Sequence, residues 1–159
     1  MTVAPKCPMP KELRPGASFI NGRSQRDKDI NSMMQNFITE ANDNFFHYDI
    51  TGFETMQFAK YEDGQYYDWH QDYFPDLTEK PCRKLTVGLS LSEYNKSSGH
   101  LEFFNGDKIT PEGLELLHEK TNSLGTAIVF ASTEWHRVTP VTNGIRYSMV
   151  CWSYGPNLK

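Results

Sequence analysis

Long apolar runs are absent from this sequence, and their absence excludes a transmembrane helix. No apolar stretch approaches the about 20 residues that a helix needs to cross a bilayer. The opening residues, MTVAPKCPMPKELRPG, also lack the apolar core of a secretory signal peptide. We therefore expect no association with a membrane.

Cysteine is scarce as well, with only Cys7, Cys82 and Cys151 in the whole chain. An odd and scattered set of cysteines does not form the disulfide framework of a small secreted protein. The sequence therefore favours a reducing compartment, which we predict to be the cytoplasm, or the cytoplasm of a host cell if the protein is viral.

A dense block of basic residues is the third missing feature. The 16 Lys and Arg residues are outnumbered by 20 Asp and Glu residues, which gives a net charge of −4. An acidic chain without clustered basic residues is a poor match for the phosphate backbone of a nucleic acid. Nucleic acid binding is thus not expected, although the sequence does not exclude a small basic patch around Arg83 and Lys84.

The length of 159 residues is enough for one domain with a hydrophobic core. Residues 1–26 are rich in proline and charge, which predicts an extended N-terminal arm. A single domain is expected over residues 27–159. It begins with a helix at residues 27–43, because apolar residues recur there at spacings of three and four. Those residues are Ile30, Met33, Met34, Phe37, Ile38 and Ala41.

From residue 51 onward, strand patterns alternate with turn signals. The strand patterns are ETMQFAKYE, QYYDWHQD, RKLTVGLSLSEY, HLEFF, TAIVFAS, HRVTPVT and IRYSMVCWSYG. Turns are expected at Asp63-Gly64, Asn105-Gly106 and Asn143-Gly144. A short helix is expected near Pro111, with Thr110 as its N-cap. This pattern predicts a mainly β fold with flanking helices, a β-sandwich or jelly roll with its core at residues 51–156.

The chain has only five histidines, and two of them stand in a pattern typical of a metal site. His70 and Asp72 are two residues apart in a strand pattern, so they point to the same side of it. His136 begins a later strand, after the apolar segment AIVF. Two histidines and one carboxylate on one face of an ion leave other positions open, as in non-haem Fe(II) oxygenases. His47 and His118 are expected to be surface or packing residues.

Arg146 lies in the apolar strand IRYSMVCW, ten residues after His136. The Asn143-Gly144 turn predicts that the strands on either side of it are antiparallel neighbours, with Arg146 deeper in the barrel. Burying a guanidinium is unfavourable without an anion, and a dicarboxylate cosubstrate would supply one through a bidentate contact. The alternative is an edge strand that holds Arg146 in water, paired with a surface acid. Together with the His and Asp pattern, the buried site is favoured.

At these residues the sequence resembles a known family. The stretches YEDGQYYDWHQD, SSGHLEFF and WHRVTPVTNGIRYSMVCWSYGP resemble, in the same order, the Fe(II)/2-oxoglutarate-dependent dioxygenases, specifically the prolyl 4-hydroxylase-like branch of bacterial and phage type. The earlier stretch ANDNFFHYDITGFETMQFAKY is similar to the lead-in strand of that branch. The resemblance implies a double-stranded β-helix with flanking helices, which agrees with the jelly roll predicted from the strand patterns.

The resemblance also implies roles for particular residues. His70, Asp72 and His136 match the iron ligands, and Arg146 matches the residue that salt-bridges the distal carboxylate of 2-oxoglutarate. The other implied positions are Tyr61 near the cosubstrate, Ser90 as a hydroxyl contact to the same carboxylate, and Tyr67, Arg83 and Trp152 on the substrate side or the pocket wall. Because alternate residues of a strand face the same side, Trp152 shares a face with Arg146, which supports its place in the pocket wall. The same alternation turns Tyr67 away from His70 unless the strand bulges. Relatives carry Gly-Gly where this chain has Gly99-His100, and His100 is expected to be a turn residue.

The function implied by the resemblance is an Fe(II)-dependent oxidation. 2-Oxoglutarate and O2 would be consumed with release of succinate and CO2, ascorbate would serve as a reductant, and a prolyl residue of a peptide or protein would be hydroxylated. One alternative is a hydroxylase of a free amino acid or another small molecule, and the acidic charge disfavours a nucleobase demethylase. A non-enzyme alternative is a jelly-roll binding module with a structural metal, which is disfavoured because such sites usually fill their coordination with protein ligands.

Overall fold

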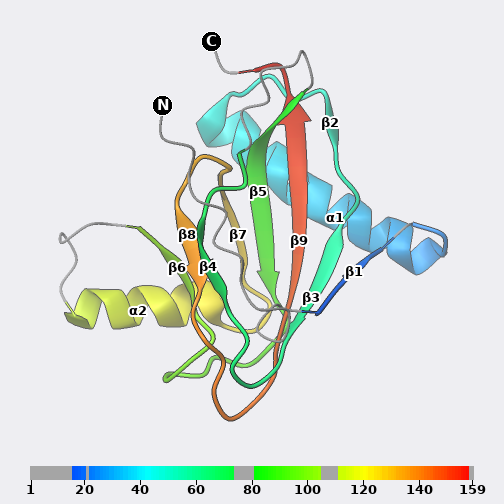
Figure 1. Cartoon of the computed structure of the whole chain (residues 1–159). Helices are drawn as coiled ribbons and strands as arrows, with labels where there is room; N and C mark the ends of the chain where they lie inside the picture. The colour runs from blue at the N-terminus through cyan, green and yellow to red at the C-terminus, as the bar shows by residue number, and fades with distance from the viewer. Residues whose placement is uncertain (1–15, 21, 74–80, 105–110, 158–159) are drawn as a thin grey trace.

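The chain folds into two antiparallel β-sheets that lie against each other, with a helix beside each sheet (Figure 1). This computed structural model describes residues 16–20, 22–73, 81–104 and 111–157. The larger sheet has six strands and the smaller has three. In order, the larger contains β1 (Gly16–Phe19), β3 (Gln57–Tyr61), β9 (Arg146–Gly155), β5 (Cys82–Ser90) and β7 (Ala127–Ala131), and β2 (Gly52–Phe53) also pairs with β9. The smaller contains β4 (Tyr67–His70), β8 (His136–Val138) and β6 (Leu101–Phe103).

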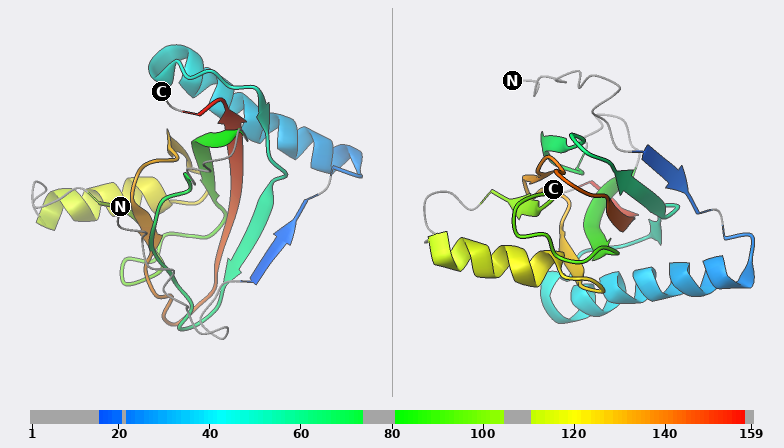
Figure 2. Two further views of the ribbon diagram at one scale, coloured as in Figure 1. Left: turned by 45° about the horizontal axis from the view of Figure 1, so that its top comes forward. Right: turned by 90° about the horizontal axis from the view of Figure 1, so that it is seen from below.

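The first helix, α1 (Gln25–Ala41), covers the outer face of the larger sheet (Figure 2). It begins two residues before the expected bound of 27, because Ser24 caps it and forms a reciprocal capping box with Asp27. After Ala41 the chain continues as a π-helix, η2 (Asn42–Phe46), and turns at His47, whose φ of 55° is left-handed. The buried Met34 and Ile38 of α1 pack on β5, as the apolar stripe predicts.

Strand β5 separates the hydrophobic core from the interior between the two sheets. Its buried residues Leu85, Val87 and Leu89 belong to the same core as α1. The alternate residues point the other way, because successive side chains of a strand face opposite sides. Among these, Thr86 and Gly88 line a cavity between the sheets. The larger sheet therefore presents an apolar face to α1 and a more polar face to the interior.

Part of the N-terminal arm expected at residues 1–26 belongs to regular structure. Gly16–Phe19 form β1, which pairs with β3 at the edge of the larger sheet. An exposed segment can join a sheet edge in this way because the ladder needs only backbone groups. Residues 1–15, which include Cys7, lie outside the described residues.

The turn at Asn143-Gly144 connects the two sheets, so the expectation of a β8–β9 hairpin is wrong. Strand β8 pairs with β4 and β6, whereas β9 pairs with β2, β3 and β5. A second crossing lies beside it at Asp63-Gly64, and Asn143 N–H donates to Asp63 Oδ1 at 2.9 Å. Because of these crossings, His136 and Arg146 belong to opposite sheets and approach each other across the interior.

The second helix, α2 (Pro111–Asn122), lies beside β6 of the smaller sheet (Figure 2). The expected Thr110 cap and the Asn105-Gly106 turn fall outside the described residues. Neither α1 nor α2, the two α-helices of the described ranges, is long and apolar enough to cross a membrane.

Candidate active site

Three ligand side chains meet where β4 and β8 run side by side. His70 and His136 are directly opposite in the register of these strands, and their ring centroids are 4.2 Å apart. Strand β4 ends at His70, so Asp72 reaches the site from the bend that follows rather than from the same strand. Its two carboxylate oxygens lie 3.7 Å from His70 Nε2 and 3.6 Å from His136 Nε2. The triad expected from the sequence is therefore assembled in space.

Both histidines direct the same ring nitrogen toward Asp72. His70 Nδ1 lies 2.7 Å from the carbonyl oxygen of Asp68, and His136 Nδ1 lies 2.9 Å from that of Glu134. A carbonyl oxygen can only accept, so each Nδ1 carries the proton and each Nε2 keeps its lone pair. Burial lowers the pKa of His70 to about 4, and the charge of His136 acts in the same direction. His70 is thus neutral at neutral pH, as a metal ligand must be.

Asp72 is oriented by the hydroxyl of Thr86, which in turn contacts the hydroxyl of Ser132, and neither residue was predicted from the sequence. Thr86 Oγ1 donates to Asp72 Oδ2 at 2.8 Å, and it lies 3.0 Å from Ser132 Oγ. Both hydroxyl residues are almost fully buried. The role of Thr86 could have been suspected from the sequence, because it is a polar residue on the inward side of the RKLTVGLS strand. Ser132 follows β7 and carried no recognisable pattern.

The ligand atoms that these residues offer are suited to a divalent iron ion. Two imidazole nitrogens and one carboxylate lie within 4.8 Å of one another. Each imidazole is held by a backbone carbonyl and the carboxylate by a hydroxyl, which is how metal ligands are usually oriented. Three protein ligands leave further positions free, as in non-haem Fe(II) sites.

Arg146 lies across the interior from the triad, opposite Tyr61 in the pairing of β9 with β3. Its guanidinium lies 5.2 Å from the centre of the Tyr61 ring, and its Nη1 donates to Ser148 Oγ at 3.0 Å. Burial lowers the pKa of Arg146 and raises the pKa of Tyr61 to about 12. In the described part of the chain, no carboxylate forms a salt bridge with this guanidinium. A partly buried cation that no described acid pairs favours an external anion as its partner.

One cavity connects the triad with Arg146. It has a volume of about 190 Å³ and is lined by residues of both sheets. His70, Asp72, His136, Tyr61, Tyr67, Arg83, Trp152 and Arg146, all expected from the sequence, contribute to its wall. The cavity therefore holds the candidate metal ligands and the candidate anion contact in a single space.

Ser90 is the exception among the expected site residues. Its hydroxyl donates to the Asn122 carbonyl at 3.0 Å, and it lines a neighbouring cavity of about 470 Å³ rather than the one around the triad. Arg146 borders both cavities. The hydroxyl that contacts the guanidinium belongs to Ser148, which is opposite Ser90 in the β5–β9 register. Ser148 is therefore the hydroxyl residue that contacts Arg146 and lines the cavity of the triad, whereas a contact between Ser90 and the cosubstrate carboxylate stays a prediction.

Tyr67 lies against the triad because β4 is irregular. The register of β4 with β8 shifts between Tyr67 and His70, so the parity that would turn Tyr67 away does not apply. The rings of Tyr67 and His70 meet edge to face with centroids 3.9 Å apart. Tyr67 is 39% exposed, which places its ring at the mouth of the cavity.

Arg83 and Trp152 form the opposite part of the wall. Arg83 makes a bidentate contact with Glu54, with Nε 2.6 Å from Oε1 and Nη2 2.7 Å from Oε2. The same guanidinium stacks 4.0 Å above the Trp152 ring. Trp152 is buried, and its Nε1 has no hydrogen-bond partner among the described residues.

His100 was expected to be a turn residue, and the structure places it in a buried position just before β6. It is only 7% exposed, and its Nε2 lies 2.5 Å from the Asn95 carbonyl oxygen. The preceding Gly99 has a left-handed φ of 71°, and a Cβ at this position would lie only 3.2 Å from Val141 Cγ2. His100 instead turns inward beside β6.

Comparison with known proteins agrees with this geometry. Residues 56–154, which contain the triad and Arg146, match the family described as the 2OG-Fe(II) oxygenase superfamily.

The chain belongs to this superfamily.

A PKHD-type hydroxylase of Aliarcobacter butzleri is 32% identical over 97 residues, which are 60% of this chain and 41% of that protein. This chain therefore matches less than half the length of that relative.

Solved structures show that the superfamily's fold extends over nearly the whole chain. A prolyl-4-hydroxylase of Pseudomonas putida superposes with a TM-score of 0.69 at 24% identity, covering 93% of this chain and 77% of that one. A prolyl hydroxylase from Trichoplax adhaerens, in complex with a peptide fragment of a hypoxia inducible factor, has a TM-score of 0.66 at 22% identity and covers 89% and 64%. The expected double-stranded β-helix is thereby confirmed.

Proposed function

We propose that this chain is an Fe(II)- and 2-oxoglutarate-dependent hydroxylase that acts on a prolyl residue of a peptide or protein. The observation that carries the proposal is the position of Arg146. It is a partly buried guanidinium that forms no salt bridge with a described carboxylate, and it shares one cavity with His70, Asp72 and His136. A metal-only binding module would have no need for such a cation.

Iron would be held by Nε2 of His70, Nε2 of His136 and the carboxylate of Asp72. When bound, the ion would supply the activation of O2 that couples oxidation of 2-oxoglutarate, to succinate and CO2, with hydroxylation of the substrate. The contribution of the chain is to orient both imidazoles through the Asp68 and Glu134 carbonyls, which fix the proton on each Nδ1 and leave each Nε2 for the ion. Thr86 holds the carboxylate in place in the same manner.

The cosubstrate would lie between the triad and Arg146. Its distal carboxylate would accept hydrogen bonds from the guanidinium and from Ser148, which already contact each other. Tyr61 has a pKa raised to about 12, so its hydroxyl remains a proton donor at neutral pH and can add a third contact. Arginine suits this role because its planar donors match a carboxylate.

The substrate would enter past Tyr67, whose ring flanks the mouth of the cavity. Tyr67 and Trp152 offer aromatic surface to an apolar and rigid ring such as that of proline. The unpartnered Trp152 Nε1 is a donor for a backbone carbonyl of a peptide. The prolyl hydroxylases among the structural neighbours, one of them with a bound peptide, support the same substrate class.

The proposal is tested by incubating the protein with Fe(II), 2-oxoglutarate, ascorbate and a library of proline-containing peptides under air. We expect succinate to form faster with a matching peptide than without it, and that peptide to gain the mass of one oxygen atom. Free L-proline is the control for a small-molecule hydroxylase. Stimulation by free proline alone would overturn the peptide assignment, and the absence of any succinate would overturn the enzymatic one.

A further inference from the structure

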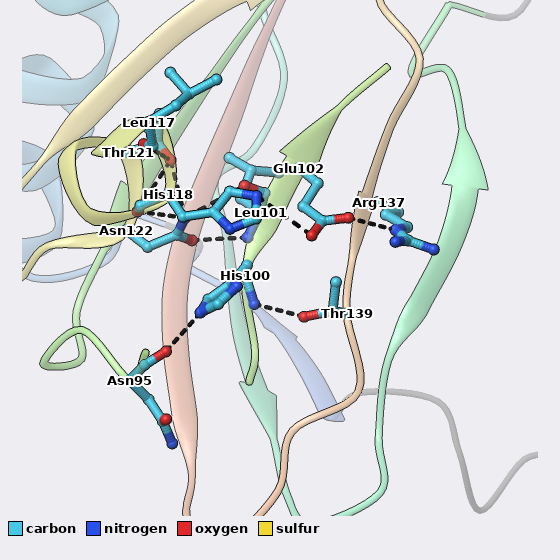
Figure 3. Close-up of polar contacts among 10 residues, drawn as sticks. All are labelled: Asn95, His100, Leu101, Glu102, Leu117, His118, Thr121, Asn122, Arg137 and Thr139. Carbon is cyan, nitrogen blue, oxygen red and sulfur yellow. Dashed lines mark hydrogen bonds and ion pairs between the residues drawn. The ribbon is translucent and has the colours of Figure 1, made fainter. Parts of the chain in front are cut away.

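A second cluster of metal-ligating side chains lies between β6 and α2. His100 and Glu102 are two residues apart at the start of β6, and His118 reaches them from α2 (Figure 3). One ring nitrogen of each histidine and one carboxylate oxygen lie within 4.8 Å of one another, as in the triad of the active site. None of the three lines the cavity that contains the triad.

The tautomer of His100 leaves one nitrogen for a ligand. Nε2 lies 2.5 Å from the Asn95 carbonyl oxygen, which can only accept, so Nε2 carries the proton. Nδ1 therefore keeps the lone pair. This is the pattern of a histidine ligand whose second nitrogen is anchored to the backbone. It repeats what the Asp68 and Glu134 carbonyls do for the two histidines of the active site.

His118 presents a buried nitrogen that has no hydrogen-bond partner among the described residues. Its Nε2 lies 3.3 Å from Glu102 Oε1, yet the orientation of the two groups does not form a hydrogen bond. Burial lowers the pKa of His118, and the nearby His100 acts in the same direction. The ring is therefore neutral at neutral pH, and no described group occupies Nε2 with a hydrogen bond. Buried polar atoms without a protein partner are rare in folded proteins, and such atoms often bind an ion or a water molecule.

Glu102 divides its two oxygens between a cation of the protein and the two histidines. Oε2 accepts a hydrogen bond from Arg137 Nε at 2.7 Å, which fixes the carboxylate plane (Figure 3). Arg137 is itself held over the Trp69 ring at 4.7 Å. Oε1 is directed toward His118. A carboxylate that binds a metal with one oxygen is usually anchored through the other in this way.

The separation of His118 Nε2 and Glu102 Oε1 matches that of two ligands on one ion. Atoms about 2.0 to 2.1 Å from a tetrahedral zinc ion are about 3.3 to 3.4 Å from each other. The observed distance between the two atoms is 3.3 Å. The two groups are too poorly aligned for a hydrogen bond, but their separation equals the edge of a zinc tetrahedron.

We propose that His100, Glu102 and His118 bind a second divalent metal ion of the zinc class, with water as the fourth ligand. His100 also lines the cavity of about 470 Å³, which gives an ion and a water molecule access to the site. The bound ion would fasten α2 to β6. Strand β6 pairs with β8, and Phe103 is directly opposite the iron-ligand candidate His136. The site is independent of the proposed function and would exist even if the active site bound no iron.

The test removes the first site so that the second can be counted. The full chain carrying Asp72→Ala and His136→Ala is freed of metal with a chelator and titrated with Zn(II) by calorimetry. We expect one Zn(II) per chain and a rise in the unfolding temperature on binding. Adding His118→Ala should weaken binding at least tenfold and abolish that rise, whereas adding Glu119→Gln, one residue further along α2, should change neither.

The expected loss is checked with a second ligand variant. Glu102→Gln keeps an acceptor for Arg137 but removes the charge of the carboxylate, and it should also weaken Zn(II) binding. If His118→Ala fails to fold by circular dichroism, Glu102→Gln decides the question. Absence of stoichiometric Zn(II) binding in the parent, or equal binding by the His118 and Glu119 variants, would overturn the proposal.

Discussion

His70 and His136 face each other across two paired strands, and each has its Nδ1 fixed by the carbonyl of the residue two positions earlier. This shared arrangement aims both lone pairs at Asp72 before any ion arrives. The strand pairing sets the separation of the rings, and the backbone sets their tautomers. A metal therefore encounters a site whose ligands need little reorganisation, which favours binding because less conformational freedom is lost.

Thr86 should be needed for tight metal binding although it is not a ligand. Replacing it with Val removes the hydroxyl that donates to Asp72 Oδ2 while keeping the shape of the side chain. Loss of such a supporting contact typically weakens metal affinity about 10- to 100-fold. Ser153→Ala is the matched control, since it removes a buried hydroxyl that bonds only the backbone of Leu85. Equal Fe(II) affinities in the two variants, measured by equilibrium dialysis, would show that Thr86 has no such role.

Arg146 should control the affinity for 2-oxoglutarate rather than for metal. A charge-assisted hydrogen bond contributes about 1.5–3 kcal/mol, so Arg146→Leu should raise the KM for 2-oxoglutarate about ten- to hundredfold. Metal content should stay close to that of the unmodified chain. Lys60→Leu serves as the control, because Lys60 is adjacent to Tyr61 but pairs with the exposed Glu62. If the KM of the Arg146 variant were unchanged, the anion would have to bind elsewhere.

Arg83 should affect the second substrate only. It borders the cavity at Trp152, on the part of the wall where a peptide would pass. We expect Arg83→Ala to raise the KM for a stimulating peptide while 2-oxoglutarate turnover without peptide persists. Arg26→Ala, on the exposed face of α1, should alter neither quantity. A peptide KM equal to that of the unmodified chain would remove Arg83 from the substrate side.

The metal-free protein should lose stability on mild acidification because of His70. Its pKa is about 4 in the folded chain, against an ordinary value of 6.5. Between these values the unfolded chain binds a proton that the folded chain does not, so acid favours unfolding. The contribution of neutral His70 to the free energy of unfolding is complete above about pH 6.5 and is lost as the pH falls toward 4.

Urea unfolding at a series of pH values checks this sign. The free energy of unfolding should fall less steeply with acid in His70→Asn than in the unmodified chain. His47→Asn is the control, since His47 is exposed and its left-handed backbone suits asparagine. Identical slopes for all three proteins would mean that His70 is not buried in its neutral form.

The sequence predicted which residues form the site better than it predicted how the strands that carry them are connected. The strand patterns were sufficient for the jelly roll, and residue type and order were sufficient to select His70, Asp72 and His136. The reason given for pairing His70 with Asp72 did not hold, because Asp72 joins His70 from a bend after β4 and not through strand alternation. The crossing at Asn143-Gly144 was not predictable, since an Asn-Gly turn looks the same whether it joins neighbouring strands or different sheets.

Two local irregularities account for the other differences. The register shift between Tyr67 and His70 brings their two rings together, although regular strand alternation would place them on opposite faces. No residue type in that stretch indicates the shift. Ser90 and Ser148 lie opposite each other on neighbouring strands, so the sequence could not decide which hydroxyl meets Arg146. Partner choice across a sheet depends on register, which is set by the whole fold.

Formation of succinate from 2-oxoglutarate is the most direct test of the central claim that His70, Asp72, His136 and Arg146 form one catalytic site. The measurement compares the unmodified chain with Asp72→Ala in the presence of Fe(II), ascorbate and air, together with metal content and circular dichroism. The account predicts that the unmodified chain forms succinate, and that Asp72→Ala remains folded, loses its iron and falls to the background without protein. Full succinate formation by the Asp72 variant, with unchanged metal content, would contradict it.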